Sequence, residues 1–472
     1  MIGDNADVIC MGAGFAGLTA GLRAAELGKS VIVLERQSAA KPYNNSRIAT
    51  GVFHVASHEA RLGEQGLIEA INMETMNYAK PELVRAIARH VGRCIDWLVA
   101  QGVALERQEA MSYVPGRSHP VLLPRRSSKA GLDWPGKGGD VALETLERQL
   151  VAKGGRVQRG VEVTALAMKD GRCVGVEAAH DGGRLTYAAR AVVIADGGFQ
   201  ANPAMLKGTV TNEPARVRLR ATPSATGDGI RMAQAAGARI TELGGFYGHV
   251  LAREAMNDER LWPYPNIDVV ATAAILVDGS GARFVDEGRG AVFVTNAIAK
   301  LADPLSASVV MSWRIWEEVG TSGVAPPNPE MTNNGGRLIE APDLAGLARA
   351  IEVPSDALAA TVAAYNTALK NNALDRLTPV RTQAKAKAWP IDAAPYCAIR
   401  VCAGVTNTMG GIDIDGEGRV LSVSGAPIPG LYAAGSSTGG LEGGPNVGYV
   451  GGIAKAFVLG LLAGESAAQN TA

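Results

Sequence analysis

The stretch that decides the fold is DVICMGAGFAG, residues 7–17. Its first five residues predict a short buried strand, and the alanine-rich run that follows the motif predicts a helix. Between them, Gly12, Gly14 and Gly17 have the GxGxxG spacing, which permits a tight turn and lets backbone N–H groups approach a pyrophosphate at the helix N-terminus. A second predicted strand ends at Glu35, where a carboxylate can hold a ribose 2′-OH. Because these parts occur in this order, the segment predicts a dinucleotide-binding βαβ unit for FAD or NAD rather than NADP.

Two later apolar segments favour FAD over NAD. A predicted strand over 190–195 runs into Asp196-Gly197, and another over 430–434 runs into Gly435. Together with the N-terminal position of the first motif, these pieces are similar to the FAD-binding lobe of flavoproteins of the two-dinucleotide-binding type. The sequence contains no second GxGxxG with a strand before it, so a resident NAD(P)H is not expected.

The composition bounds the class of protein. With 472 residues, 47% of them hydrophobic and 19% charged, the chain is long enough for about three domains or lobes and has a globular composition. Lys+Arg and Asp+Glu both number 46, which argues against a nucleic-acid binder that depends on a general basic field. The five cysteines form no CxxC pair, so neither a disulfide framework nor a metal site is expected. The N-terminus has no basic region before its apolar run, and no apolar run reaches about 18 residues, so a cytoplasmic protein without a membrane segment is expected.

Five further motifs extend the resemblance to flavoproteins along the chain. NNSRIATG at 44–51 looks like a flavin-passing segment, and ATGDGI at 225–230 looks like a turn before a helix. A hairpin over 275–287, TMGGI at 408–412 and LYAAG at 431–435 follow in the same order. On these motifs the chain resembles the fumarate reductase/succinate dehydrogenase flavoprotein superfamily, FAD-binding type 2, over nearly its whole length. Within it, the chain looks closer to ketosteroid dehydrogenase and tricarballylate dehydrogenase-like members than to true fumarate reductases.

This resemblance implies an α/β fold, with a Rossmann-like FAD-binding domain of the two-dinucleotide-binding type and an inserted α+β capping domain. We place the first part of the FAD-binding domain at 1–240, the capping domain at 241–378 and the final part of the FAD-binding domain at 379–472. The residues expected to bind FAD are Gly12, Gly14, Phe15, Ala16, Gly17, Glu35, Arg36, Asn45, Ser46, Ala49, Thr50, Gly51, Val163, Ala195, Asp196, Gly197, Asp228, Gly435, Ser436, Gly451, Gly452 and Ile453.

The link between protein and cofactor is expected to be non-covalent. In membrane-bound succinate dehydrogenases a histidine is bonded to FAD, and Asn45 occupies the corresponding position here. An amide nitrogen cannot form that bond, so the resemblance implies FAD held by contacts alone.

Departures from the fumarate reductase pattern concern the residues that hold and protonate a C4-dicarboxylate. Asn407 stands where that subfamily places a histidine, and Val447 and Ala291 stand where it places arginines. His249 is the retained counterpart, and Arg289 lies two residues before the position of Ala291. Succinate and fumarate are therefore expected to be poor substrates.

The catalytic candidates are Tyr449, His249, Arg289 and Asn407. Tyr449 lies in the loop before the C-terminal helix, and we expect it, or backbone N–H groups of that loop, to donate to a substrate carbonyl. We expect the segment 446–449, His249 and Arg289 to line the substrate pocket. Each candidate also has a structural alternative: packing for Tyr449, a core position for His249, an ion pair within its hairpin for Arg289 and a turn cap for Asn407.

Two weaker candidates lie elsewhere in the first part of the chain. His54 follows the flavin-passing segment, and an arginine doublet, Arg125-Arg126, lies in a connection rich in proline and glycine. Such a doublet is more often solvated than buried, so a role in binding a substrate carboxylate is the less favoured interpretation.

The resemblance implies hydride transfer between flavin N5 and a carbon near a carbonyl group. The first hypothesis is an FAD-dependent dehydrogenase that acts on a CH–CH bond next to a ketone or carboxylate. Its expected substrate is an alicyclic keto compound or keto acid, which loses an α-proton to a base and a β-hydride to N5. The alternatives are an ene-reductase on a substrate other than a C4-dicarboxylate, and a redox-neutral isomerase or hydratase that contains FAD. Either redox reaction needs a small-molecule carbonyl or carboxylate substrate and a soluble electron acceptor or donor.

Overall fold

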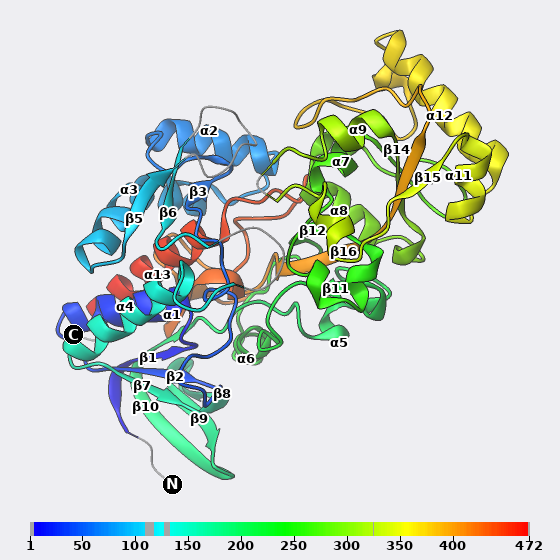
Figure 1. Cartoon of the computed structure of the whole chain (residues 1–472). Helices are drawn as coiled ribbons and strands as arrows, with labels where there is room; N and C mark the ends of the chain where they lie inside the picture. Colours follow the sequence, from blue (N-terminus) through cyan, green and yellow to red (C-terminus); the bar gives the residue numbers. More distant parts are fainter. Residues whose placement is uncertain (1–3, 109–117, 127–132, 324, 471–472) are drawn as a thin grey trace.

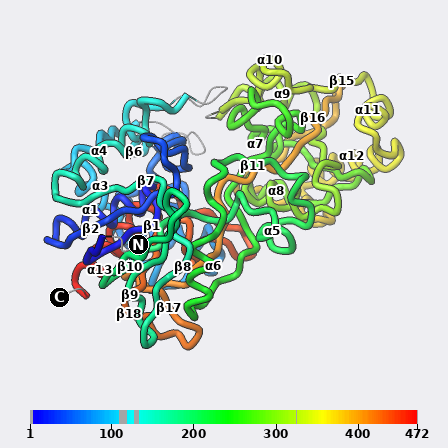
Figure 2. Tube along the Cα trace, turned by 90° about the horizontal axis from the view of Figure 1, so that it is seen from below, coloured from blue at the N-terminus to red at the C-terminus, as the bar shows by residue number. Residues whose placement is uncertain are grey.

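The chain folds into two lobes. The computed structural model describes residues 4–108, 118–126, 133–323 and 325–470. Figure 1 and Figure 2 show one lobe that holds both termini and a second lobe formed by the middle of the chain.

A largely parallel sheet forms the centre of the first lobe. The strand order is β17-β18-β10-β1-β2-β7, and β8 and β9 extend it as an antiparallel hairpin beside β10. β1 lies between β10 and β2 and is parallel to both, and its last four residues are buried, as is typical of central strands in parallel sheets. The strands are β1 Ala6–Met11, β2 Val31–Glu35, β7 Arg156–Arg159, β8 Glu162–Lys169, β9 Arg172–His180, β10 Gly183–Ile194, β17 Arg419–Leu421 and β18 Pro427–Ala433.

Helices α1 and α13 pack closely over this sheet. A side chain at Gly460 would meet the carbonyl oxygen of Ala16 at 2.6 Å, and one at Gly464 would meet that of Ala20 at 2.4 Å. The two glycines of α13 therefore allow its backbone to approach that of α1, which begins directly after the GxGxxG turn. The helices of this lobe are α1 Phe15–Glu26, α2 Glu64–Thr75, α3 Pro81–Ala100, α4 Gly139–Ala152, α6 Asp228–Ala235 and α13 Gly452–Gln469. The short helix α5 Pro203–Leu206 lies toward the second lobe (Figure 1). Two short hairpins complete it, β3 His54–Val55 with β4 His58–Glu59 and β5 Leu105–Gln108 with β6 His119–Leu122.

The second lobe is built around one long strand, β16. This strand pairs in antiparallel fashion with β12, β14 and β15 and in parallel with β11, and β13 continues the sheet beyond β14. The strands are β11 Arg218–Leu219, β12 Phe246–Ala252, β13 Ile275–Val277, β14 Ser308–Ser312, β15 Ile339–Ala341 and β16 Tyr396–Thr408. The helices are α7 Asp268–Ala273, α8 Ala291–Ala299, α9 Trp313–Glu318, α10 Glu330–Asn333, α11 Leu344–Ile351 and α12 Ser355–Lys370.

The division into 1–240, 241–378 and 379–472 stays a prediction, and strand pairing adds one fact to it. β11 and β16 lie outside 241–378, yet they hydrogen-bond within the sheet of the second lobe. Segments on both sides of the middle part therefore complete its sheet, and the chain passes between the lobes along β16 (Figure 1).

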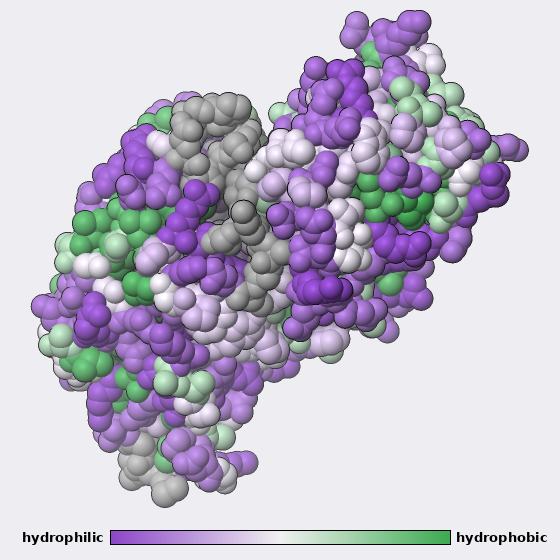
Figure 3. Space-filling view, in the orientation of Figure 1, coloured by the Kyte–Doolittle hydropathy of each residue, from purple (hydrophilic) through white to green (hydrophobic). Residues whose placement is uncertain are grey.

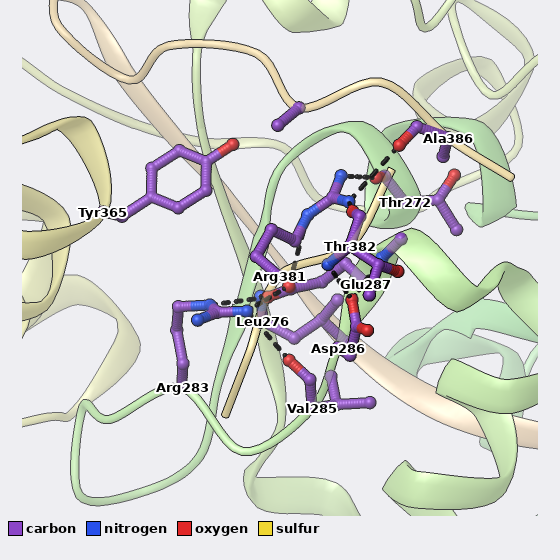
Figure 4. Close-up of polar contacts among 12 residues, drawn as sticks. Thr272, Leu276, Arg283, Val285, Asp286, Glu287, Tyr365, Arg381, Thr382 and Ala386 are labelled. Atoms are coloured by element: carbon purple, nitrogen blue, oxygen red, sulfur yellow. Dashed lines mark hydrogen bonds and ion pairs between the residues drawn. The ribbon is translucent and has the colours of Figure 1, made fainter. Parts of the chain in front are cut away.

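A buried cluster of charges holds the second lobe together (Figure 4). The carboxylate of Glu287 is fully buried and accepts hydrogen bonds from Leu276 N at 3.0 Å and from Arg283 Nε at 3.1 Å. The guanidinium of Arg381 lies 3.5 Å from the same carboxylate and donates to Thr272 O at 2.7 Å. A buried carboxylate is tolerated because opposite charges and hydrogen-bond donors surround it. The cluster joins β13 and the turn after it to the segment that leads into β16.

All five cysteines are buried free thiols. Cys10 lies on β1, Cys94 on α3 and Cys173 on β9, and Cys397 and Cys402 lie on β16. Burial raises the pKa of the Cys10 thiol to about 12, and it raises the pKa of the other four as well.

Hydrophilic residues cover most of the molecular face in Figure 3, and hydrophobic areas are confined to parts of each lobe. Within the described ranges, no helix has the length and apolar character needed to cross a bilayer.

Candidate functional site

Two cavities adjoin each other, and the first lies at the carboxyl ends of the central strands. The first extends from the N-terminus of α1 past the end of β2, and the second lies under the second lobe. Ligands in open α/β sheets bind at the edge where the first cavity lies. They share five lining residues, Phe15, Asn45, Ser46, Ser436 and Ala456.

The GxGxxG turn has the geometry that an approaching pyrophosphate needs. Gly12 has φ of +96°, and a Cβ there would lie 2.7 Å from the carbonyl oxygen of Ala195. A Cβ at Gly17 would lie 1.9 Å from Gly12 O, so α1 can begin this close to the turn only with glycine. Gly14, the N-cap residue of α1, offers no side chain to the first N–H groups of the helix, and Phe15 N donates to Ser46 Oγ at 3.0 Å. This N-terminus therefore carries the partial positive charge that binds phosphate.

Glu35 lies at the end of β2 in the first cavity. Its carboxylate is 5% exposed and accepts from Ala13 N at 3.1 Å and from Gln37 N at 3.0 Å. Each carboxylate oxygen can accept a second hydrogen bond, so the group is fixed in place and still able to accept from a ribose hydroxyl.

Asp196 lies at the end of β10, beside the same turn. Its Oδ2 accepts from Gly229 N at 2.7 Å, while Oδ1 has no hydrogen-bond partner among the described residues. Burial raises the pKa of this carboxyl to about 6. A cradle of close glycines, an open helix N-terminus and carboxylate oxygens with unused acceptor capacity fits the pyrophosphate and ribose of FAD.

Most of the residues expected to bind FAD line one of the two cavities. Those in the first cavity are Gly12, Gly14, Phe15, Ala16, Glu35, Arg36, Asn45, Ser46, Val163, Ala195, Asp196, Gly197, Asp228, Gly435 and Ser436. Ala49, Thr50, Gly452 and Ile453 line the second cavity. Gly17, Gly51 and Gly451 line neither cavity, and a Cβ at any of the three would lie within 3 Å of an atom of the surrounding structure. The individual contacts with FAD stay predictions.

Asn45 and Asn407 meet where the two cavities join. Asn45 Nδ2 donates to Asn407 Oδ1 at 2.9 Å and to Thr406 O at 2.9 Å, and Asn45 Oδ1 accepts from Thr222 N at 3.0 Å. Where the resemblance implies a histidine bonded to FAD, the chain thus has an amide that is hydrogen-bonded within the protein.

Tyr247 and His249 line the second cavity on the side of the second lobe, and Asp268 lies behind His249 and completes a hydrogen-bonded chain of three polar residues. His249 Nδ1 lies 2.5 Å from Asp268 Oδ2, and His249 Nε2 lies 3.0 Å from the Tyr247 hydroxyl. Asp268 is held by Val250 N at 2.9 Å. Burial lowers the pKa of His249 although Asp268 opposes this shift, and burial raises the pKa of the Tyr247 hydroxyl. With Nδ1–H donating to Asp268, Nε2 is the acceptor that faces Tyr247.

Tyr449 lies against this chain from the first lobe. Its ring stacks on that of Tyr247 with centroids 3.8 Å apart, and its hydroxyl oxygen accepts from Gly452 N at 2.8 Å. Gly452 is the first residue of α13, so the tyrosine oxygen is the partner of the first N–H group of that helix. Burial raises the pKa of Tyr449 well above its ordinary value, which keeps the hydroxyl protonated and able to donate.

Arg289 and residues 446–448, which were also expected to line the substrate pocket, do not line the second cavity. Arg289 donates to Asn446 Oδ1 at 2.9 Å and to Pro445 O at 2.7 Å, and its guanidinium stacks on Phe293 at 3.7 Å. Of the segment 446–449, only Tyr449 is among the lining residues. Arg289 therefore joins the two lobes beside the cavity, and a substrate contact of this residue stays a prediction.

Sequence reasoning missed several residues of the second cavity. Arg126 was expected to be solvated, but it is 3% exposed and lines the cavity, whereas its neighbour Arg125 is exposed. Arg220, Tyr247 and Tyr264 also line it and belong to no motif. A basic residue at every second position in RVRLR, 216–220, was visible in the sequence, but that alternation is typical of a solvent-facing strand.

Comparison with known proteins agrees with this geometry. A family model described as an FAD binding domain matches residues 7–448. The chain is 27% identical to a 4-oxocyclohexanecarboxylate 2-dehydrogenase of Sinomonas cyclohexanicum, over 99% of this chain and 93% of that protein. It is 28% identical to an NADH:fumarate oxidoreductase of Klebsiella pneumoniae (strain 342) over 98% of this chain, but it spans only 48% of that longer protein.

A solved structure extends the likeness to the whole fold. The 3-ketosteroid-Δ4-(5α)-dehydrogenase of Rhodococcus jostii RHA1 superposes with a TM-score of 0.75 at 23% identity, over 99% of this chain and 98% of that one. These matches confirm the family, the FAD-binding fold and FAD as the cofactor, and the relatives named here are oxidoreductases.

Proposed function

Because the chain belongs to the FAD binding domain family, we propose that it forms a C=C bond next to the carbonyl of a cyclic ketone or keto acid. The observation that carries the proposal is the Asp268–His249–Tyr247 chain, whose Tyr247 and His249 line the cavity that adjoins the FAD cradle. Support also comes from the relative named 4-oxocyclohexanecarboxylate 2-dehydrogenase, which matches this chain over nearly the full length of both proteins.

FAD, when bound, supplies the acceptor for the β-hydride. The protein's part is to remove the α-proton. Tyr247 hydrogen-bonds to His249 Nε2, so its oxygen can take the α-proton of the substrate while its own proton passes to Nε2. Asp268, 2.5 Å from Nδ1, stabilises the imidazolium that results. The three residues therefore act together as a general base.

Tyr449 has the complementary role at the substrate oxygen. Its oxygen accepts from Gly452 N, so the hydroxyl proton is left to donate, and its raised pKa keeps that proton in place. A donor directed at a ketone oxygen stabilises the negative charge that develops when the α-proton leaves. Tyr247 would thus remove the α-proton, and Tyr449, stacked on it, would donate a hydrogen bond to the substrate oxygen in the same step.

The reverse reaction is the second candidate. The fumarate oxidoreductase relative is named for an NADH-dependent reaction, so an ene-reductase on a different substrate uses the same residues in the opposite sense. Turnover with an artificial electron acceptor supports desaturation, and turnover with reduced viologen supports reduction. A redox-neutral isomerase or hydratase is the third candidate, and it predicts substrate conversion without any change in the flavin spectrum.

The test is anaerobic mixing of the FAD-loaded protein with 4-oxocyclohexanecarboxylate, cyclohexanone and succinate. We expect the flavin absorbance to bleach with a cyclic keto compound and not with succinate. Asp268→Asn should slow bleaching and change its pH profile, because the amide no longer stabilises a charged His249, while FAD content stays the same. Bleaching by succinate alone, or wild-type pH dependence in Asp268→Asn, would contradict the proposal.

A further inference from the structure

We infer that Arg126 and Arg220 form a binding site for a substrate carboxylate in the second cavity. The inference rests on the proposed function and narrows its substrate class to cyclic carbonyl compounds that carry one carboxylate. Both arginines line the cavity that contains Tyr247 and His249.

Arg220 is held in place with its charge inside the protein. Its backbone N–H donates to Val405 O at 2.7 Å beside β16, and its side chain is 5% exposed. Nε donates to Pro263 O at 2.9 Å, Nη1 donates to Thr406 Oγ1 at 3.0 Å, and the guanidinium lies 4.8 Å from the ring centroid of Tyr264. All of these partners are neutral, so they orient the guanidinium without cancelling its charge.

Arg126 is buried with most of its donors unused. It is 3% exposed, and its Nη1 donates to Ile48 O. Among the described residues, Nε and Nη2 have no hydrogen-bond partner. Burial lowers the pKa of Arg126, and the positive charge of Arg220 acts in the same direction.

Two buried guanidiniums without an acidic partner are costly, because burial removes each charge from water. In the part of the chain that the structure describes, neither forms an ion pair with a carboxylate. A carboxylate in the cavity would supply the missing charge, and the planar fork of a guanidinium can bind both of its oxygens.

The phosphates of FAD do not account for these arginines. The pyrophosphate cradle at the N-terminus of α1 belongs to the first cavity, whereas Arg126 and Arg220 line only the second. The family's carboxylate-binding arginine is replaced by Val447, which is 8% exposed and packs against Gly245. The chain therefore has no arginine at that position, and the two arginines of the second cavity come from other segments of the chain.

Ligand binding without turnover tests this inference. FAD-loaded wild type is titrated with cyclohexanecarboxylate and with the neutral cyclohexanecarboxamide, by calorimetry and by the change in the flavin spectrum. Hydrogen bonds to charged groups are worth about 1.5–3 kcal/mol, so the acid should bind roughly tenfold to a hundredfold more tightly than the amide. Arg220→Met and Arg126→Met should each lose that preference, and Arg220→Lys should keep part of it. Arg125→Met, which removes the exposed neighbour, should behave as wild type.

The binding results separate a carboxylate site from the other roles that the two arginines could have. Equal affinity of wild type for the acid and the amide would overturn the inference even if an arginine variant failed to fold. Loss of FAD from Arg126→Met or Arg220→Met, with no loss of acid preference in the remaining holoprotein, would assign the arginines to the cofactor instead. Acid preference without bleaching by any cyclic keto compound would support the carboxylate site and contradict the proposed reaction.

Discussion

Replacing Tyr449 by phenylalanine removes one hydroxyl that has two hydrogen-bonding roles. Its oxygen accepts from Gly452 N at 2.8 Å, and its proton is the proposed donor to the substrate carbonyl. Loss of the acceptor leaves the first N–H of α13 without that partner, which costs about 1–3 kcal/mol in the free energy of unfolding. Loss of the donor removes one oxyanion hydrogen bond, worth up to roughly 4 kcal/mol, so kcat should fall by about tenfold to a thousandfold.

The assay is steady-state desaturation with an artificial acceptor at matched FAD occupancy, together with urea unfolding. Tyr365→Phe is the matched control, because Tyr365 is also buried and donates to Trp389 O at 2.9 Å in the second lobe. It should lose similar stability and keep its kcat. The reasoning fails if Tyr449→Phe retains nearly wild-type kcat, since phenylalanine keeps the ring that stacks on Tyr247 at 3.8 Å. It also fails if both variants lose kcat equally.

Four further predictions concern the cofactor and the stability of the fold. Glu35→Ala should weaken FAD binding by roughly tenfold to a hundredfold in titrations of the apoprotein without changing the rate per bound FAD, and unchanged affinity would refute the ribose contact. Because Asn45 replaces the linking histidine, acid precipitation should leave the flavin in the supernatant, and flavin in the washed pellet would show a covalent bond. Glu287→Gln leaves two buried arginines uncompensated and should lower the free energy of unfolding by about 3–5 kcal/mol in denaturant curves, whereas Glu317→Gln, at an exposed position, should change it by little. Burial lowers the pKa of His54 from 6.5 to about 4. The unfolded chain therefore binds a proton at His54 at a higher pH than the folded protein does, so the free energy of unfolding should fall by about 3 kcal/mol as the pH falls from about 6.5 toward 4. His54→Gln should flatten this part of the stability profile, and an unchanged profile would rule out this assignment.

The parts of the fold that depend on local sequence could be predicted. The turn at 12–17, the helix after it and the acid at the end of β2 lie within one short stretch, and each has its own residue signal. The pairing of β11 and β16 with the middle sheet could not be predicted, because it joins residues such as Arg218 and Gly404 that are far apart in the chain. Hydrophobic alternation shows that a strand exists and does not show which strand lies beside it.

The same distinction applies to the site. Residues near a phosphate or ribose follow motifs, because a backbone turn must have one shape to hold them. The second cavity is assembled from side chains of many segments, and only tertiary structure decides whether a given arginine is solvated. Arg125 and Arg126 are adjacent and chemically identical, yet one is exposed and the other 3% exposed. No spacing rule separates them.

Because all five thiols are buried, their rates of chemical labelling would report how often each lobe opens. Only a thiolate reacts quickly with an alkylating reagent, and burial both shields these groups and keeps them protonated. Labelling should therefore proceed at the rate at which each region opens. Cys10, Cys94 and Cys173 report on the FAD lobe, and Cys397 and Cys402 report on β16 in the second lobe. Peptide-resolved labelling with and without added FAD would then show which lobe the cofactor holds closed, and in what order the two come apart.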